Sequence, residues 1–143
     1  MGYVVSGSDR ASSKVTDMLI DSGVKVFIPQ SKDNITDDID FIVYTAAIKE
    51  DNEEMVEAKR RGIPMMERGE FLGEITKLYP NTIGIAGTHG KTSTTSMVSL
   101  IFIEAGCDPT VQVGSILSNI GGNYRIGKSD TLIIEACEYC DSY

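Results

Sequence analysis

The sequence lacks a hydrophobic run of the roughly 18 residues that a membrane-spanning helix requires. Basic residues are also scarce, because 13 Lys and Arg stand against 21 Asp and Glu, for a formal net charge of −8. This balance argues against nucleic acid as the main ligand, since such ligands need basic surfaces. The first residues, Met1 to Val5, lack the basic segment of a secretory signal. These absences predict a cytoplasmic protein that binds neither membranes nor nucleic acids.

Cysteine and histidine are rare, with three cysteines and one histidine in 143 residues. An odd number of cysteines without a secretory signal indicates reduced thiols. Cys137 and Cys140 have the Cys-x-x-Cys spacing of some redox and metal-binding pairs. Because His89 is the sole histidine and there is no second cysteine pair, a four-ligand zinc site cannot be assembled. We interpret these cysteines as structural, with a redox or metal role as the alternative.

The 41% hydrophobic content is enough for the core of one ordinary domain or of two small ones. Short apolar segments alternate with segments of helical spacing, which is typical of an α/β fold with parallel sheets. We expect strands at 3–5, 24–28, 41–45, 63–66, 82–86, 111–113 and 131–136, and helices at 14–22, 53–61, 70–78 and 94–105. The strand at 41–45 and the helix at 94–105 are apolar enough to be buried, and 114–128 resembles a glycine-rich loop.

The helical and extended patterns are interrupted at Tyr79-Pro80-Asn81, which predicts a boundary between domains 1–80 and 81–143. Polar clusters follow the expected strands on both sides of this boundary. In parallel sheets, ligands bind beyond the carboxyl ends of the strands. The clusters therefore predict binding edges, and they are Ser6–Asp9, Thr45–Ile48, Gly87–Ser93 and Glu135–Asp141.

The segment that most clearly indicates chemistry is Gly87-Thr88-His89-Gly90-Lys91-Thr92-Ser93, between an expected strand and an expected helix. This layout is typical of a phosphate-binding loop, in which backbone N–H groups point at the anion and glycines let it approach. A lysine in the position of Lys91 supplies charge to the terminal phosphates of a nucleoside triphosphate, and a hydroxyl such as that of Thr92 joins a Mg²⁺ shell. We expect Lys91 to be exposed before ligand binds.

The spacing of this loop departs from that of the ordinary P-loop, which has a glycine five residues before the Gly of Gly-Lys. That position is Ile85 here, and the nearest upstream glycine is Gly87. The alternative interpretation is therefore an ordinary strand-to-helix turn that happens to contain Gly-Lys-Thr. Two other classes of protein could also contain this loop. One is a nucleotide-binding module without catalytic activity, and the other is a P-loop kinase or GTPase.

Several segments together resemble the muramyl ligases of bacterial cell-wall synthesis, in the same order along essentially the whole chain. The short loop Gly87–Thr92 has that family's form of the phosphate loop. The other similar segments are Ser6-Gly7-Ser8-Asp9, Thr45-Ala46-Ala47-Ile48, Gly62-Ile63-Pro64 with Arg68, Gly121-Gly122-Asn123 and Glu135-Ala136-Cys137-Glu138-Tyr139. His89 and the Glu135 segment resemble the alanine-adding branch most, and the branch that recycles tripeptides is the alternative. A ligase of the same superfamily that adds glutamate to folate is a further alternative. It is disfavoured because such a ligase has no UDP-binding half that resembles the segments Ser6–Asp9 and Thr45–Ile48.

The resemblance implies an incomplete Rossmann-like UDP-binding domain followed by the start of a P-loop ATPase domain. The implied reaction uses ATP to convert the lactyl carboxylate of UDP-N-acetylmuramate to an acyl phosphate, which the amine of L-alanine attacks. By resemblance, Lys91 contacts the β- and γ-phosphates, Thr92 holds one Mg²⁺ and Glu135 holds a second. By the same resemblance, His89 lines the phosphate or acyl-phosphate site, and the alternative is that it only shapes the loop. Glu135 as a solvated or capping acid is the alternative for that residue.

The first half resembles the UDP-sugar-binding domain of the family, which implies substrate-binding roles for Ser6, Ser8, Asp9 and Thr45. Each of these four residues is equally well interpreted as a turn or capping residue. Family members also have an earlier strand with a glycine-rich loop and a long C-terminal part. The sequence therefore predicts an inactive fragment of a bacterial cytoplasmic enzyme, with an exposed sheet edge through which copies could associate.

Overall fold

The computed structural model describes residues 2–136, which form an α/β chain with parallel strand pairs, as the alternation of segments predicts. The chain divides into two compact units, Met1–Glu67 and Arg68–Tyr143. Cys137 and Cys140 lie outside the described residues. No helix within residues 2–136 is both long and apolar enough to cross a membrane.

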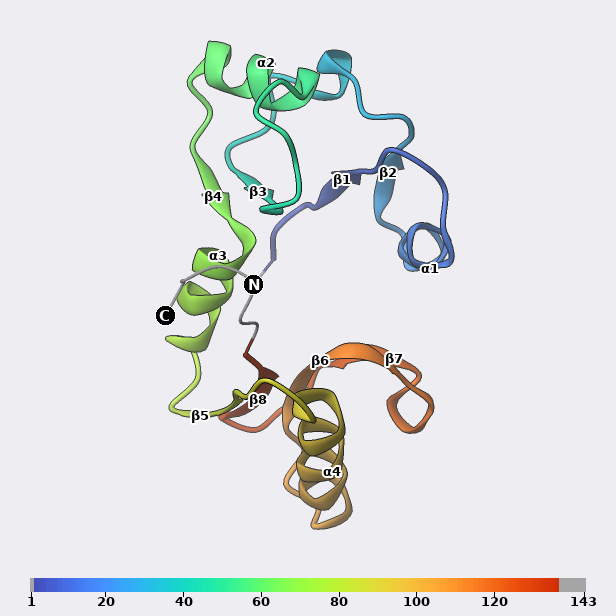
Figure 1. The fold of residues 1–143 in the computed structure, drawn as a ribbon, viewed down its shortest axis with the longest axis vertical. Helices are drawn as coiled ribbons and strands as arrows, with labels where there is room; N and C mark the ends of the chain where they lie inside the picture. The colour runs from blue at the N-terminus through green and yellow to red at the C-terminus, as the bar shows by residue number, and fades with distance from the viewer. Residues whose placement is uncertain (1, 137–143) are drawn as a thin grey trace. The chain divides into compact units, whose positions relative to one another are not determined.

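The first unit contains two strand–helix–strand arrangements, each with a parallel pair of short strands (Figure 1). The elements are β1 (Ser6–Ser8), α1 (Lys14–Asp21), β2 (Lys25–Phe27), the 3₁₀ helix η1 (Lys32–Asn34), β3 (Ile42–Tyr44), α2 (Glu53–Arg61) and β4 (Met65–Glu67). β1 begins where the expected strand 3–5 ends, and Tyr3 and Val4 are exposed without regular structure. The polar residues Ser6 and Ser8 are thus part of the strand itself, which corrects the sequence-based placement.

α2 has the end signals that its sequence predicts. The Asn52 side-chain oxygen accepts hydrogen bonds from the backbone N–H groups of Glu54 at 2.9 Å and Met55 at 3.3 Å. Gly62 ends the helix in the left-handed conformation, with φ of 68°. Acidic residues in the first turn and basic residues in the last turn complement the helix dipole. β3, in contrast, is less buried than its apolar sequence predicts, because Val43 remains 40% exposed.

Acid should weaken the first unit partly through Glu57. Hydrogen bonds from Arg60 and then Arg61 lower the pKa of the Glu57 carboxyl to about 2, below its ordinary value of 4.5. A lowered folded-state pKa contributes stability above the unfolded pKa, and this contribution is lost as the pH falls from about 4.5 to about 2. We expect Glu57→Gln to flatten that part of the stability profile in urea unfolding, and added salt to do the same. A profile identical to that of the unmodified chain would contradict this expectation.

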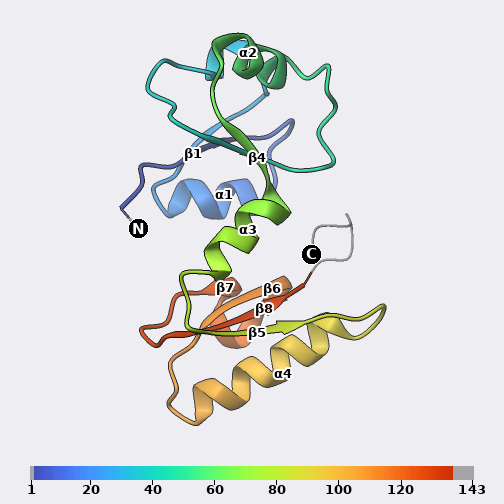
Figure 2. The same cartoon turned by 90° about the vertical axis from the view of Figure 1, so that its left-hand side faces the viewer.

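The second unit has a four-stranded sheet in the order β5-β8-β6-β7 (Figure 2). β8 pairs in parallel with both β5 and β6, and β7 pairs antiparallel with β6. Its elements are α3 (Arg68–Thr76), β5 (Asn81–Ile85), α4 (Lys91–Glu104), β6 (Thr110–Leu117), η2 (Ser118–Ile120), β7 (Gly122–Arg125) and β8 (Thr131–Glu135). The predicted loop 114–128 is therefore wrong, since a β-hairpin closed at Gly121, with φ of 71°, occupies most of it.

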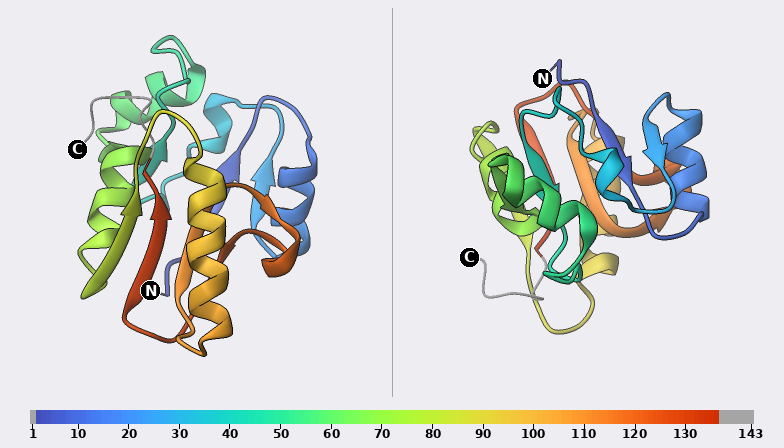
Figure 3. Two further views of the ribbon diagram at one scale, coloured as in Figure 1. Left: turned by 60° about the horizontal axis from the view of Figure 1, so that its bottom comes forward. Right: turned by 90° about the horizontal axis from the view of Figure 1, so that it is seen from above.

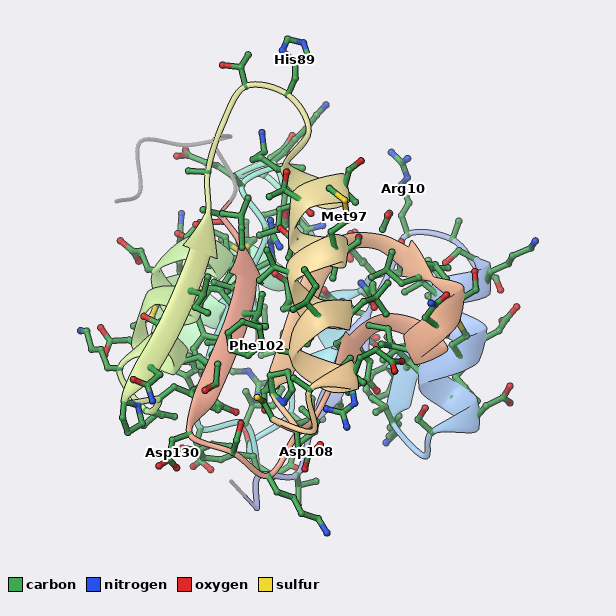
Figure 4. The ribbon with its side chains drawn as sticks, turned by 90° about the horizontal axis from the view of Figure 1, so that it is seen from below. Arg10, His89, Met97, Phe102, Asp108 and Asp130 are labelled. Carbon is green, nitrogen blue, oxygen red and sulfur yellow. The ribbon has the colours of Figure 1, made fainter. Side chains whose placement is uncertain are left out.

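The core of the second unit lies between the sheet and α4, which runs along one face of the strands (Figure 3). Val111, Val113 and Ile133 form its fully buried centre, and Phe102 of α4 packs against them. Figure 4 shows Phe102 toward the strands and Met97 on the outer side of the helix. Met97 is 58% exposed, so the prediction of an entirely buried helix is wrong.

The residues of α4 that are most buried are polar. Thr95 and Ser99 have no exposed surface, and their hydroxyls donate to the carbonyl oxygens of Lys91 at 2.8 Å and Thr95 at 2.7 Å. These bonds within the helix satisfy the hydroxyls, so burial leaves no unpaired donor. The face of α4 that meets the sheet thus combines these small polar residues with Val98 and Phe102, while Met97 and Ile101 remain exposed.

Candidate nucleotide-binding site

The predicted phosphate loop connects the end of β5 to the start of α4 (Figure 3). Gly87 has φ of 149° and Gly90 has φ of 76°, conformations that L side chains rarely adopt. Gly90 is the N-cap of α4, and its carbonyl oxygen accepts from the N–H of Thr94 at 2.9 Å. The helix begins at Lys91, three residues before the predicted start. Lys91, Thr92 and Ser93 therefore lie in the first turn of the helix, the part of a helix whose backbone N–H groups suit an anion.

Lys91 is half-buried, which corrects the expectation that it is exposed. Its ammonium group donates a hydrogen bond to the carbonyl oxygen of Gly87. This bond joins the first residue of the helix to the beginning of the loop. The positive charge is therefore held against the loop backbone, within the turn that a phosphate group would enter.

Thr92 and Glu135 are brought together by strand pairing. Ile85 is the register partner of Glu135, and the N–H of Ala136 donates to the Ile85 carbonyl oxygen at 3.0 Å. The Thr92 hydroxyl donates to Glu135 Oε1 at 2.8 Å. The carboxyl end of β8 thus places its acidic residue directly beside the first turn of α4, as the sequence predicts.

Gly114 completes this arrangement, and the sequence analysis missed it. Its backbone N–H donates to Glu135 Oε2 at 2.7 Å, so both carboxylate oxygens have a partner. A Cβ atom at position 114 would lie only 2.8 Å from Oε2, closer than such atoms approach in real structures. The glycine directly follows the expected strand 111–113, a position beside the Glu135 strand end that could have drawn attention to it.

The chemistry of Thr92 and Glu135 fits Mg²⁺. Magnesium takes oxygen ligands, commonly one or two protein carboxylates together with substrate phosphates and water. Glu135 is a half-buried carboxylate, and Thr92 adds a hydroxyl oxygen beside the loop. Within residues 2–136 there is no group of three His, Cys, Asp or Glu side chains that would hold a metal ion alone. A Mg²⁺ ion here would thus depend on phosphate oxygens for further ligands.

The other predicted loop residues face solvent. Thr88, His89 and Ser93 are all exposed. Figure 4 shows His89 at the outer tip of the loop, at the opposite end of the strands from Asp108 and Asp130. The structure therefore groups Lys91, Thr92 and Glu135 closely and leaves the imidazole of His89 apart from them.

Three of the four predicted residues of the first unit lie at the carboxyl end of a strand or directly after it, since Ser8 and Asp9 are at the end of β1 and Thr45 follows β3, whereas Ser6 begins β1. Ser6 and Ser8 belong to β1, and the Ser8 hydroxyl donates to Glu54 Oε2 at 2.5 Å. Asp9 Oδ1 accepts from the N–H of Ala11 at 3.3 Å, and Thr45 Oγ1 accepts from the N–H of Ala47 at 3.4 Å. Asp9 and Thr45 thus make local turn contacts, which is the alternative that the sequence left open.

The comparisons with known proteins agree on one family. The model of the Mur ligase family, catalytic domain, matches residues 1–80. The UDP-N-acetylmuramate–L-alanine ligase of Lachnoclostridium phytofermentans is 53% identical over 99% of this chain, and that of Lachnospira eligens is 56% identical over 99%. The chain spans 30% and 31% of the length of these two relatives.

Solved structures give the same result. The UDP-N-acetylmuramate–alanine ligase of Thermotoga maritima matches with a TM-score of 0.85 and 30% identity, over 91% of this chain and 30% of that one. The UDP-N-acetylmuramate:L-alanyl-γ-D-glutamyl-meso-diaminopimelate ligase of Neisseria meningitides matches with a TM-score of 0.88 and 27% identity, over 99% of this chain and 47% of that one. Family model, curated relatives and solved structures together show that this chain belongs to the Mur ligase family.

Proposed function

We propose that this chain supplies the phosphate-binding part of an ATP-dependent ligase that joins L-alanine to UDP-N-acetylmuramate in peptidoglycan precursor synthesis. The observation that carries the proposal is the contact of Thr92 with Glu135 beside the loop Gly87–Lys91. Curated relatives with that name, about half identical over 99% of the chain, support the choice of substrates. The bacterial cytoplasm is the proposed location.

In this proposal the loop binds the phosphates of ATP. Backbone N–H groups from Gly87 to Ser93, including those of Thr88, His89 and Gly90, line the turn and the first turn of α4. The ammonium group of Lys91 leaves the Gly87 carbonyl and contacts the terminal phosphates. His89 reaches the transferred phosphoryl group only if its loop moves, because it lies at the exposed tip.

Mg²⁺, when bound, neutralises charge on the phosphates of ATP. Thr92 and Glu135 are the residues that would hold it. The Thr92 hydroxyl donates its hydrogen to Glu135 Oε1, so the lone pairs of the Thr92 oxygen would be available to the cation. Gly114 keeps the other carboxylate oxygen in place through its N–H group.

The two halves of the chain have different proposed ligands. Residues 1–80 form a Rossmann-like domain for the UDP part of UDP-N-acetylmuramate, with Ser6, Ser8, Asp9 and Thr45 at the ends of β1 and β3. Residues 81–143 form the beginning of the ATP-binding domain. Since the curated relatives are about three times as long, we expect this chain alone to bind substrates without completing the reaction.

The proposed reaction has two steps. An oxygen of the lactyl carboxylate attacks the γ-phosphorus of ATP, and ADP leaves with the electrons of the broken P–O bond. The amine of L-alanine then attacks the acyl carbon, phosphate leaves, and the amine loses a proton. The chain contributes positioning and positive charge to the first step, which is where phosphoryl transfer needs them.

Tripeptide recycling is the second candidate function. It is favoured by the TM-score of 0.88 to the tripeptide-adding ligase of Neisseria meningitides over 99% of this chain. The two functions are distinguished by phosphate release from a full-length ligase carrying this chain, with ATP and UDP-N-acetylmuramate. We expect release with L-alanine and little with L-alanyl-γ-D-glutamyl-meso-diaminopimelate. The reverse preference would replace the main proposal by the second candidate.

The proposed metal site predicts a specific effect of Gly114→Ala. The new Cβ atom displaces the Glu135 carboxylate, because it would lie 2.8 Å from Oε2. We expect the Mg²⁺-dependent part of ATP binding to weaken about tenfold, equivalent to one lost charged contact. Calorimetric titration of ATP with and without Mg²⁺ measures this effect. Gly84→Ala in β5 is the control, since no atom lies within 4 Å of its added Cβ. Equal binding by both variants would remove Glu135 from the proposed site.

A further inference from the structure

Glu54 is a buried acidic residue that the proposed mechanism does not use. It is 8% exposed and lies in the first turn of α2. Its carboxylate accepts three hydrogen bonds from two other segments of the first unit. The Ser8 hydroxyl of β1 donates at 2.5 Å, and the Asn34 amide and the Ser31 N–H, both of η1 and its N-cap, donate at 2.7 Å and 3.3 Å. These three hydrogen bonds give both carboxylate oxygens of Glu54 a partner.

The contact with Glu54 determines what the Ser8 hydroxyl can do. A serine hydroxyl has one hydrogen to donate and two lone pairs that accept. In the structure the hydrogen is directed at Glu54 Oε2, so only the lone pairs of Ser8 are available to another molecule. Ser8 is only partly buried and ends β1, which is the end of a parallel strand where ligands bind.

We propose that Glu54 is a positioning residue that fixes the Ser8 hydroxyl as a hydrogen-bond acceptor for a neutral donor of the nucleotide-sugar substrate. The donor is a ribose hydroxyl or the N–H of the uracil base. The inference rests on the proposed function of the first unit as a UDP-binding domain. It narrows that function, because it assigns Ser8 to the nucleoside part of UDP.

Phosphate does not fit this position. Phosphate oxygens at neutral pH accept hydrogen bonds, and the Ser8 hydroxyl has no second hydrogen to give them. The negative charge of Glu54, whose oxygen lies 2.5 Å from the Ser8 oxygen, also repels an anion there. The Glu54–Ser8 pair therefore favours the nucleoside end of the substrate and disfavours its diphosphate.

Glu54→Gln separates this role from a purely structural one. The glutamine oxygen still accepts from Asn34 and Ser31, so the ties between the segments are kept. Its amide nitrogen donates to Ser8, which turns the serine hydrogen outward. The substitution thus reverses the hydrogen-bonding direction of Ser8 without removing a side chain. Glu53→Gln, the same charge change at the preceding exposed position, is the matched control.

The test measures binding of UDP, 2′-deoxy-UDP, 3′-deoxy-UDP and 3-methyl-UDP to a full-length ligase carrying this chain. We expect one of the three analogues to bind the unmodified protein about tenfold more weakly than UDP, because one hydrogen bond is lost. The analogue that binds weakly identifies the donor. In Glu54→Gln we expect UDP to bind about tenfold more weakly than it binds the unmodified protein. The weakly binding analogue should then bind Glu54→Gln as well as UDP does. Glu53→Gln should bind UDP and the analogues as the unmodified protein does. Pyrophosphate should bind Glu54→Gln as tightly as it binds the unmodified protein.

Ser8→Ala is the second variant, and it should abolish the same difference even if Glu54→Gln fails to fold. Equal binding of UDP and all three analogues by the unmodified protein would overturn the inference and leave the proposed UDP site intact. An equal loss of UDP and pyrophosphate binding in Glu54→Gln would overturn it in favour of a structural role. Absence of UDP binding by the unmodified protein would refute the proposed function of the first unit, and the inference with it.

Discussion

Replacing Lys91 with alanine should weaken Mg-ATP binding by about 10- to 100-fold, while the chain remains folded. Hydrogen bonds between charged groups contribute about 1.5–3 kcal/mol, and the ammonium group is the strongest charge in the loop. Stability should fall by about 1 kcal/mol, because the substitution also removes the hydrogen bond from Lys91 to the Gly87 carbonyl. Calorimetric titration and thermal unfolding of the same samples measure both effects.

Lys77→Ala is the matched control for this prediction. Lys77 is an exposed lysine that pairs with Glu74, so its removal changes the net charge equally without touching the loop. We expect its ATP affinity to equal that of the unmodified chain. If Lys91→Ala and Lys77→Ala bind Mg-ATP equally well, Lys91 has no role in phosphate binding. A loss of binding that merely parallels unfolding would assign Lys91 a structural role instead.

The site was only partly predictable. The local sequence determines the phosphate loop, whereas the position of Glu135 beside that loop depends on the order of the strands in the sheet. Gly87 and Gly90 adopt positive φ angles, which is why a turn was predictable from glycine alone. Glu135 was expected at a strand end next to the phosphate loop, but its pairing with Ile85 was not predicted, because an alternation of strands and helices does not determine which strands are neighbours. The role of Gly114 was missed because a backbone N–H group has no signature in the sequence, and only its place after the expected strand 111–113 could have pointed to it.

The helix start shows where local reasoning gives the wrong boundary. Thr94 resembles an N-cap, since threonine often accepts from helix N–H groups. In the structure Gly90 takes that place in the left-handed conformation, and the first turn begins at Lys91. The difference changes the chemistry, because a helix that begins at Lys91 directs the N–H groups of its first turn toward the phosphate loop.

The other errors concern which surfaces face which neighbour. Periodicity gives no preference among the faces of a helix that is apolar on all sides, and α4 buries Thr95 and Ser99 in place of Met97. The contacts of Glu54 were likewise not predicted from the sequence, since acidic residues in the first turn of a helix are normally solvated. Only the three-dimensional structure shows Ser8, Ser31 and Asn34 converging on that carboxylate.

Replacing Gly127 with alanine should destabilise the second unit more than the same substitution at Gly84 or Gly114. An added Cβ atom would lie 2.1 Å from the carbonyl oxygen of Asp108 and 2.4 Å from that of Pro109. Both are backbone atoms and cannot rotate away as a side chain can. The Asp108 carboxylate is itself fixed by Arg125 at 2.5 Å and by the N–H of Lys128 at 3.0 Å. Relief of the overlap therefore requires the whole turn to move.

We expect Gly127→Ala to lower the free energy of unfolding by about 3 kcal/mol, the upper range for overpacking. The melting temperature should fall by more than about 10 °C for a unit of this size. Gly122→Ala is the control, because the nearest atom to its added Cβ is 3.8 Å away. A Gly127→Ala chain as stable as this control would mean that the turn is loosely held.

Because this turn joins β7 to β8, its movement would also displace the strand that carries Glu135. Gly127→Ala should therefore weaken Mg-ATP binding only together with stability, whereas Lys91→Ala weakens binding in a folded chain.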